Sequence, residues 1–503
     1  MPTFTTHDGT ELAYRVLGEG EPLVCLAGGP MRDAGYLGDL GGLAAHRALV
    51  LLDARGTGAS AEPADPGTYR CDRQVGDVEA LRAHLGLERI DLLGHSAAGN
   101  LAVLYAAAHP ERIRSLVLVT SLSRALGVGT TDEEWDKAVE VFADRPWYPE
   151  ARAALDTIGP DTPLRRVYEI TAPFAYGRWD AAAQEHAART GPEMNWEAAP
   201  VYHGEGAYDP ETTRRALGAL TAPVLILAGE YDAGPTPAKA AALFPHAELV
   251  VQPGAAHHPW VDDPEAFART VAAFLDPDVS TVTVDGVRIA YRVAGPEDAR
   301  PVVLVHGRGN DGTTWTVISA DLAADHRVYA MDLRGHGLSD RPGSYGFEDF
   351  RDELGGFLEA LGLTGATVVA HSMGAAAAYL LAQCAPGLIG RLVLEEAPAF
   401  VPLDPPRPVA ERPEGALPFD WGVVTATDAE LNAPDPAWRE ELSAIAAPTL
   451  VLAGGPTSHI PQDQLSVLAS DIPDARLVTI EVGHLIHNAA PAAFLAALRE
   501  FGL

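Results

Sequence analysis

The sequence contains few cysteines, three in 503 residues. Cys25, Cys71 and Cys384 match no metal-binding spacing, and so small a number excludes a fold held together by disulfides. The chain also lacks an uncharged apolar run of about 20 residues, the length that a membrane-spanning helix requires. The N-terminus has neither the basic nor the apolar segment of a secretion signal. These absences predict a cytoplasmic protein that does not enter a membrane.

Basic residues are scarce as well, with 36 Lys and Arg against 69 Asp and Glu, for a net charge of −33. This charge repels phosphate groups, so it argues against binding to nucleic acid or to an anionic membrane surface. Apolar residues make up 47% of the chain, enough to fill sizeable cores. Because 503 residues are too many for one core, we expect two domains.

A repeated pair of motifs divides the chain. Asp-Ala-Arg-Gly-Thr-Gly-Ala-Ser at 53–60 precedes Gly-His-Ser-Ala-Ala, centred on Ser96, and Asp-Leu-Arg-Gly-His-Gly-Leu-Ser at 332–339 precedes Ala-His-Ser-Met-Gly, centred on Ser372. A Ser between small residues, just after an apolar run, is typical of a nucleophile on a sharp strand-to-helix turn. The repeat predicts two related domains, residues 1–276 and 277–503.

Both halves show the same succession of elements. A hairpin around an Asp-Gly turn opens each half, and short apolar runs alternating with helical patterns follow. Such runs are typical of a parallel sheet covered on both faces. We therefore expect two tandem α/β domains, each with a mostly parallel eight-stranded sheet, helices on both faces and a lid after the sixth strand. The predicted lids are about 122–221 and a shorter, partly irregular 398–447, rich in Pro and acidic residues.

The first domain carries the residues of a Ser-acid-His triad in the order that α/β-hydrolases use. Ser96 is the predicted nucleophile. Asp232 follows the strand 224–228 and can orient an imidazole, with Glu230 as the alternative acid. His257 follows the last strand and is the predicted base, with His258 as the alternative. His95, next to the nucleophile, is expected to have a structural role.

Two backbone N–H groups in each domain are candidates for an oxyanion hole. In the first domain they belong to Gly29, in a turn after the third strand, and to Ala97, which follows the nucleophile. In the second domain they belong to Arg308 and Met373 at the matching places. Paired N–H groups at such positions stabilise the negative charge of an acyl-transfer intermediate.

The first half resembles the α/β-hydrolase superfamily, in particular the proline iminopeptidase-like branch of peptidase family S33. The resemblance covers the half from end to end, but the branch's His-Gly-Gly-Pro-Gly motif is Ala-Gly-Gly-Pro-Met at 27–31. The difference favours serine hydrolysis in general over strict proline-releasing activity. In this branch acidic lid residues hold the substrate's free amine, and the resemblance offers as candidates Glu193, Glu197, Glu205 and Asp209.

The second half resembles esterase-, lipase- and haloperoxidase-like α/β-hydrolases. Ser372 and His484 take the nucleophile and base positions, and His487 is expected to line the pocket or to cap the loop. No carboxylate stands where Asp232 stands in the first half, because Thr457 occupies that place. Some α/β-hydrolases, haloalkane dehalogenases among them, carry the acid after the sixth strand. At that position Glu396 is the favoured candidate and Glu395 is the alternative. A third possibility is a degenerate site that has no orienting acid.

These residues predict a serine hydrolase that cleaves a small ester, amide or short-peptide substrate through an acyl-enzyme, without cofactor or metal. Two alternatives stay open, since a fold does not determine its chemistry. One is a non-hydrolytic enzyme of the same fold, a lyase, cyclase or cofactor-free oxygenase. The other is one active domain supported by a second, inactive scaffold domain.

Overall fold

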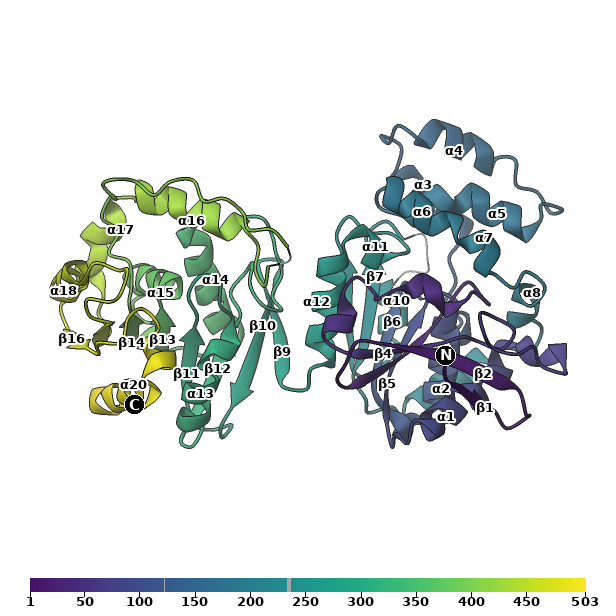
Figure 1. The fold of residues 1–503 in the computed structure, drawn as a ribbon, viewed down its shortest axis with the longest axis horizontal. Helices are drawn as coiled ribbons and strands as arrows, with labels where there is room; N and C mark the ends of the chain where they lie inside the picture. Colours follow the sequence, from purple (N-terminus) through teal and green to yellow (C-terminus); the bar gives the residue numbers. More distant parts are fainter. Residues whose placement is uncertain (122, 233–236, 416) are drawn as a thin grey trace. The chain divides into compact units, whose positions relative to one another are not determined.

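The computed structural model describes residues 1–121, 123–232, 237–415 and 417–503, so the first residue of the predicted first lid, 122, lies outside it. The chain forms two compact units, Met1–Leu275 and Asp276–Leu503 (Figure 1). Within the described ranges, no helix is both long enough and apolar enough to span a bilayer.

Each unit is built on one eight-stranded sheet, with strand order β1-β2-β4-β3-β5-β6-β7-β8 in the first and β9-β10-β12-β11-β13-β14-β15-β16 in the second. At one edge of the first sheet β1, β2 and β4 pair antiparallel, as β9, β10 and β12 do in the second, and all other neighbours pair parallel. The first sheet comprises β1 (Thr3–Thr5), β2 (Glu11–Leu17), β3 (Pro22–Leu26), β4 (Ala48–Leu52), β5 (Ile90–His95), β6 (Ile113–Val119), β7 (Val224–Gly229) and β8 (Ala247–Gln252). The second comprises β9 (Val279–Val284), β10 (Val287–Ala294), β11 (Arg300–Val305), β12 (His326–Met331), β13 (Ala366–His371), β14 (Ile389–Glu395), β15 (Thr449–Ala453) and β16 (Ala475–Thr479).

Helices bury both faces of the second sheet, as alternation along a strand requires. Val303 and Val305 belong to a core shared with α14 (Phe347–Ala360) and α15 (Met373–Cys384). Val302 and Leu304, on the opposite face, belong to a core shared with α13 (Thr316–Leu322) and α20 (Pro491–Phe501). The first unit follows the same plan with α1 (Val75–His84), α2 (Ala98–Ala108) and α12 (Pro264–Leu275). The predicted tandem α/β fold is confirmed.

The first lid is helical and the second is only partly so. The first contains α3 (Asp132–Glu140), α4 (Tyr148–Leu155), α5 (Leu164–Thr171), α6 (Ala181–Ala188), α7 (Thr190–Glu193), α8 (Ala199–Tyr202) and α9 (Pro210–Leu217). Figure 1 shows α3 to α6 gathered in a layer of their own beside the first sheet. In the second lid, residues 398–415 form no helix or strand, and α16 (Gly422–Asn432) and α17 (Ala437–Glu440) follow.

Candidate active site

Both predicted nucleophiles sit on a sharp turn between a strand and a helix. Ser96 joins β5 to α2 with φ 53°, and Ser372 joins β13 to α15 with φ 52°. An L-residue rarely adopts this left-handed backbone, so the turn needs small neighbours that let the strand and helix approach. A Cβ at Gly94 would lie 2.9 Å from the backbone oxygen of Ala98. The turn therefore has the geometry of a nucleophile elbow.

In the first unit, three side chains form a hydrogen-bonded chain. Ser96 Oγ lies 2.8 Å from Nε2 of His257, and Nδ1 of the same imidazole lies 2.9 Å from Oδ1 of Asp232. Ser96 is buried, and the side chains of Asp232 and His257 are 9% and 25% exposed. Glu230 instead accepts a hydrogen bond from the Gly254 N–H. In this arrangement His257 can take the hydroxyl proton of Ser96 while Asp232 fixes its tautomer.

The alternative base and the neighbouring histidine both have other partners. His258 is buried, stacks on Tyr176 and lies 3.2 Å from the Ala175 carbonyl through Nδ1. His95 donates from Nε2 to the His257 carbonyl at 2.9 Å. Its Nδ1 accepts from the Tyr36 hydroxyl at 2.6 Å, and that hydroxyl accepts from the Gly28 N–H at 2.9 Å. His95 thus links the oxyanion turn to the loop of His257, which is a structural role.

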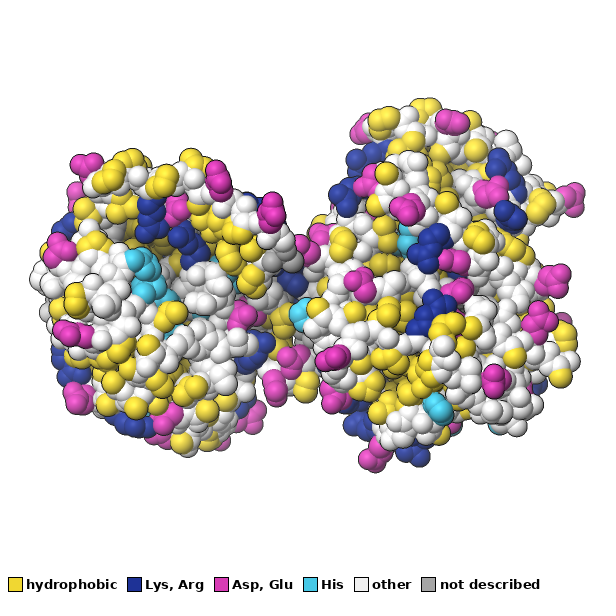
Figure 2. Space-filling view, viewed as in Figure 1, with side chains coloured by type: hydrophobic (Ala, Val, Ile, Leu, Met, Phe, Trp, Pro, Cys, Tyr) yellow, Lys and Arg dark blue, Asp and Glu magenta, His cyan; other side chains and the backbone are white. Residues whose placement is uncertain are grey.

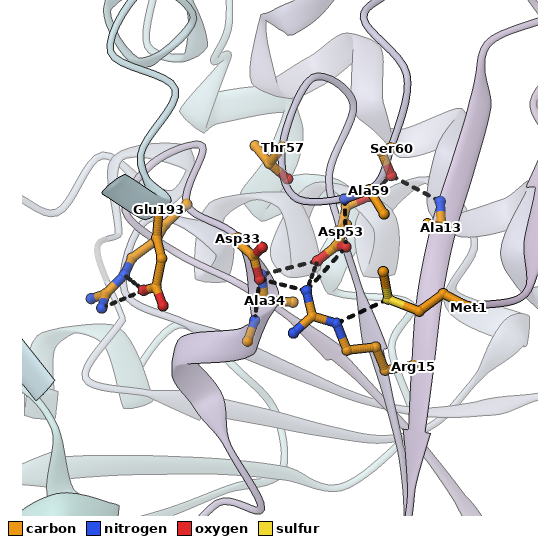
Figure 3. A network of polar contacts seen from close by, with 12 residues as sticks. Met1, Ala13, Arg15, Asp33, Ala34, Asp53, Thr57, Ala59, Ser60 and Glu193 are labelled. Atoms are coloured by element: carbon orange, nitrogen blue, oxygen red, sulfur yellow. Dashed lines mark hydrogen bonds and ion pairs between the residues drawn. The ribbon is translucent and has the colours of Figure 1, made fainter. Parts of the chain in front are cut away.

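The repeated Asp-x-Arg-Gly motif fixes the loop behind each oxyanion turn. Figure 3 shows the buried Asp53 carboxylate, which accepts hydrogen bonds from the Ala34 and Ala59 N–H groups, both at 3.1 Å. The Ser60 hydroxyl donates to the Asp53 carbonyl at 2.6 Å and accepts from the β2 backbone. Asp332 receives the matching N–H bonds in the second unit, and Ser339 donates to its carbonyl. The motif therefore stabilises the loops next to each candidate site.

A cavity of about 560 Å³ opens onto the first site. Ser96 and His257 line it together with an aromatic wall from the core domain and the lid: Tyr36, Trp135, Tyr168, Phe174 and Tyr176. This volume and lining are typical of a pocket for a small organic molecule. The cavity also receives the side chains of Arg124 and Asp132.

None of the four lid acids suggested by the peptidase resemblance is among the lining residues described for this cavity. Glu193 pairs with Arg32 at 2.8 Å and with Arg189 at 2.7 Å. Asp209 caps α9, and Glu197 and Glu205 are exposed. The carboxylate that the lid does contribute to the cavity is Asp132, in the first turn of α3.

The second unit assembles a matching chain with a different acid. Ser372 Oγ lies 3.2 Å from Nε2 of His484, and Nδ1 of His484 lies 3.2 Å from Oε2 of Glu396. Glu396 is fully buried and also accepts from the Gly454 N–H and the Ser458 hydroxyl. Burial alone would raise the pKa of Glu396, but its hydrogen bonds with His484, Ser458 and Gly454 outweigh burial and hold that pKa below its usual value.

Glu395 contacts a different histidine. Its Oε2 lies 2.6 Å from Nδ1 of His487, and both side chains are fully buried. Burial raises the pKa of Glu395 to about 7 and lowers the pKa of His487 to about 3. His487 stacks on Trp315 and lies 3.0 Å from the Thr314 hydroxyl. The pair therefore belongs to the interior beside the site.

Backbone hydrogen bonds show which positions of the two units correspond. The N–H of Ser96 donates to Val119 O as that of Ser372 donates to Glu395 O. Likewise, the N–H of Thr120 donates to Leu227 O in β7 as that of Glu396 donates to Leu452 O in β15. Thr120 thus occupies the place of Glu396, and its hydroxyl donates to the His257 carbonyl at 2.9 Å.

The turn that carries one predicted oxyanion donor lies beside the serine in each unit. A Cβ on Gly28 would lie 2.9 Å from the Ser96 Cβ, and a Cβ on Gly307 would lie 3.1 Å from the Ser372 Cβ. Gly29 and Arg308 follow these glycines. Across the parts of the chain that the structure describes, no group of three or more His, Cys, Asp or Glu residues is arranged to hold a metal ion.

Comparison with known proteins finds relatives of parts of this chain. Relatives include a proline iminopeptidase of Lactobacillus helveticus, 42% identical over 124 residues (23% of this chain, 42% of that protein). Another, from Levilactobacillus brevis, is 29% identical over 294 residues (52% of this chain, 92% of that protein). An uncharacterized Mycobacterium tuberculosis protein is 37% identical over 130 residues, 26% of this chain. The chain spans only 38% to 42% of the length of the first curated relatives it matches.

Solved structures similar to part of the chain include a hydrolase from Pseudomonas aeruginosa, 26% identical with a TM-score of 0.40, covering 45% of this chain and 99% of that one. An esterase from Thermogutta terrifontis is 22% identical with a TM-score of 0.42, covering 55% and 97%. The model of the alpha/beta hydrolase fold family matches residues 21–264 and 300–432, most of both units. The chain therefore belongs to the α/β-hydrolase fold family.

Proposed function

We propose that both units are serine hydrolases, and the observation that carries this proposal is the same Ser–His–carboxylate hydrogen-bond chain in each. Ser96 or Ser372 attacks the substrate carbonyl while His257 or His484 takes the hydroxyl proton. The histidine returns this proton to the leaving alcohol or amine, and an acyl-enzyme remains. Water, deprotonated by the same histidine, then releases the acid and restores the serine.

The first unit's substrate is a small ester or amide with an apolar acyl portion. The aromatic wall of the 560 Å³ cavity supports this assignment. Several relatives are named proline iminopeptidases, and the resemblance to that branch implies that lid carboxylates hold the substrate's free amine. Glu193 is engaged by Arg32 and Arg189, so its charge is already balanced. This pairing favours esters and amides without a free amine.

Activity-based labelling tests the proposal. A fluorophosphonate probe should modify wild type at two serines, Ser96→Ala and Ser372→Ala at one each, and the double variant at neither. Peptide mapping by mass spectrometry identifies the sites. Undiminished labelling in the double variant would contradict the assignment. Absence of a trapped acyl adduct while substrate is consumed would instead support the non-hydrolytic alternative.

Substrate pairs test the specificity of the first unit in the Ser372→Ala variant. The kcat/KM for p-nitrophenyl butyrate should exceed that for proline p-nitroanilide. An aminopeptidase would show the reverse order, and Asp132→Asn would then raise KM for the prolyl substrate, because Asp132 is the lid carboxylate that reaches the cavity.

A further inference from the structure

Two arginines of the second unit share one carboxylate near the proposed active site. Arg308 Nη1 donates to Asp428 Oδ1 at 2.7 Å, and Arg407 Nη1 donates to the same oxygen at 2.8 Å. Arg308 also donates to the Thr427 hydroxyl at 3.0 Å. Two guanidinium groups against one carboxylate leave an excess of one positive charge in this trio. That excess is notable in a chain with a net charge of −33.

One member of the trio, Arg308, follows the turn that lies beside Ser372. Arg308 directly follows Gly307, and a Cβ on Gly307 would lie 3.1 Å from the Ser372 Cβ. The ring of His459 lies 4.0 Å from that of His484. Burial first, then the charges of His484, Arg407 and Arg308, lower the pKa of His459. Both arginines are therefore within electrostatic range of the histidine that contacts His484.

The arginines are held in place but are not covered. Their side chains are 29% and 30% exposed, while that of Asp428 is 15% exposed. Asn432, at the end of α16, accepts from the Arg407 N–H at 2.7 Å and donates to its carbonyl at 3.1 Å. On the unit that carries β9 to β16, Figure 2 shows basic side chains in a hollow next to exposed histidine side chains. A ligand can reach such groups without the lid unfolding.

We propose that Arg308 and Arg407 form an anion subsite of the second unit, which takes substrates that carry a carboxylate near the scissile carbonyl. Asp428 illustrates how the two guanidinium groups can bind a carboxylate, because both donate to its side chain. Each guanidinium has five N–H donors, so donors remain for a second carboxylate. The substrate class is a monoester or monoamide of a dicarboxylic acid. This inference rests on the proposed hydrolytic function of Ser372.

Matched esters test the subsite in a Ser96→Ala background, where hydrolysis depends on Ser372. We expect kcat/KM for mono-p-nitrophenyl adipate to exceed that for its neutral methyl ester. Arg407→Ala should lower this preference at least about tenfold, mainly through KM, as loss of a charge-assisted hydrogen bond implies. Arg407→Lys should retain part of it. Arg412→Ala is the control, since this lid arginine contacts only backbone carbonyls in the described interactions, those of Pro413 and Gly415.

The possible failures are distinguishable. If both esters are hydrolysed and Arg407→Ala leaves their ratio unchanged, the anion subsite is wrong and the hydrolase proposal stands. If neither ester is hydrolysed, calorimetric titration of the Ser96→Ala, Ser372→Ala protein with glutarate decides. Binding that weakens with Arg407→Ala then supports an anion site on an inactive domain, and absence of binding overturns the inference.

Discussion

His484 Nδ1 lies 3.2 Å from Glu396, a residue that follows β14, whereas its counterpart His257 lies 2.9 Å from Asp232, which follows β7. The two imidazoles thus receive their carboxylates from different strands. The Gly454 N–H and the Ser458 hydroxyl, from the loop after β15, donate to Glu396. The loop that lacks an acid therefore supports the acid supplied by the neighbouring strand.

Removing the charge of Glu396 should disable the second site. Glu396→Gln, in a Ser96→Ala background, is expected to lower kcat about 10³- to 10⁴-fold, because an amide favours the wrong tautomer of His484. Ester hydrolysis rates measure the loss. Glu395→Gln is the matched control, because its carboxylate contacts His487, and equal losses in both variants would refute the assignment of Glu396.

A carboxylate at position 457 should restore activity to the Glu396→Gln variant. Thr457 lies three residues after Gly454, as Asp232 lies three residues after Gly229, and both glycines end or directly follow the corresponding strands. Adding Thr457→Asp to Glu396→Gln should therefore raise kcat by at least about tenfold over Glu396→Gln alone. Thr457→Asn in the same background should give no recovery, and a recovery equal to that of Asp would show that charge is not the cause.

The Tyr36 hydroxyl should contribute to the first site through two buried hydrogen bonds. Tyr36→Phe keeps the ring, over which Arg32 lies at 4.1 Å, but leaves the Gly28 N–H and His95 Nδ1 without this partner. We expect a loss of stability of about 1–3 kcal/mol and a lower kcat for Ser96-dependent hydrolysis. Thermal unfolding and kinetics measure the two effects. Tyr14→Phe, whose hydroxyl contacts only His84 among the described bonds, should change kcat little.

The stability of the second unit should depend on the protonation of Glu395. Burial raises its pKa from 4.5 to about 7, so between these pH values the native state holds a proton that the unfolded state has lost. The stability that the second unit gains from the protonated Glu395 carboxyl is fully present below about pH 4.5 and is lost as the pH rises through 7. Glu395→Gln, which cannot ionise, should therefore gain stability relative to wild type between pH 5 and pH 8. Calorimetry at both pH values measures this difference, and a constant difference would contradict it.

Local patterns locate much of the site from the sequence. A short motif after an apolar strand marks both serines and both histidines of the proposed triads, Ser96, Ser372, His257 and His484. The sequence alone therefore indicates their positions. The choice between Glu395 and Glu396 is not readable in the same way. Strand alternation separates the two side chains, but the direction of each depends on the turn at Glu396, where φ is 52°.

Long-range contacts explain what the sequence does not reveal. Glu193 looks like any other lid acid, and its neutralisation by Arg32 joins residues 161 positions apart. Tyr36 and Ser458 belong to no motif. Yet the Tyr36 hydroxyl donates to His95, which contacts the His257 loop, and the Ser458 hydroxyl donates to Glu396 of the second proposed triad. Pairings of this kind depend on how the lid and loops fold over the sheet, and no local periodicity encodes them.

The two carboxylate positions also suggest how the copies diverged. A side chain after β6 or β14 and one after β7 or β15 can both serve the same imidazole, as Glu396 and Asp232 illustrate. An ancestral copy carrying both acids would have kept its orienting charge when either one was lost. The acid could then move from one strand end to the other without an inactive intermediate. Its position is therefore a poor marker of descent, and either strand end is a convenient place to introduce the acid by design.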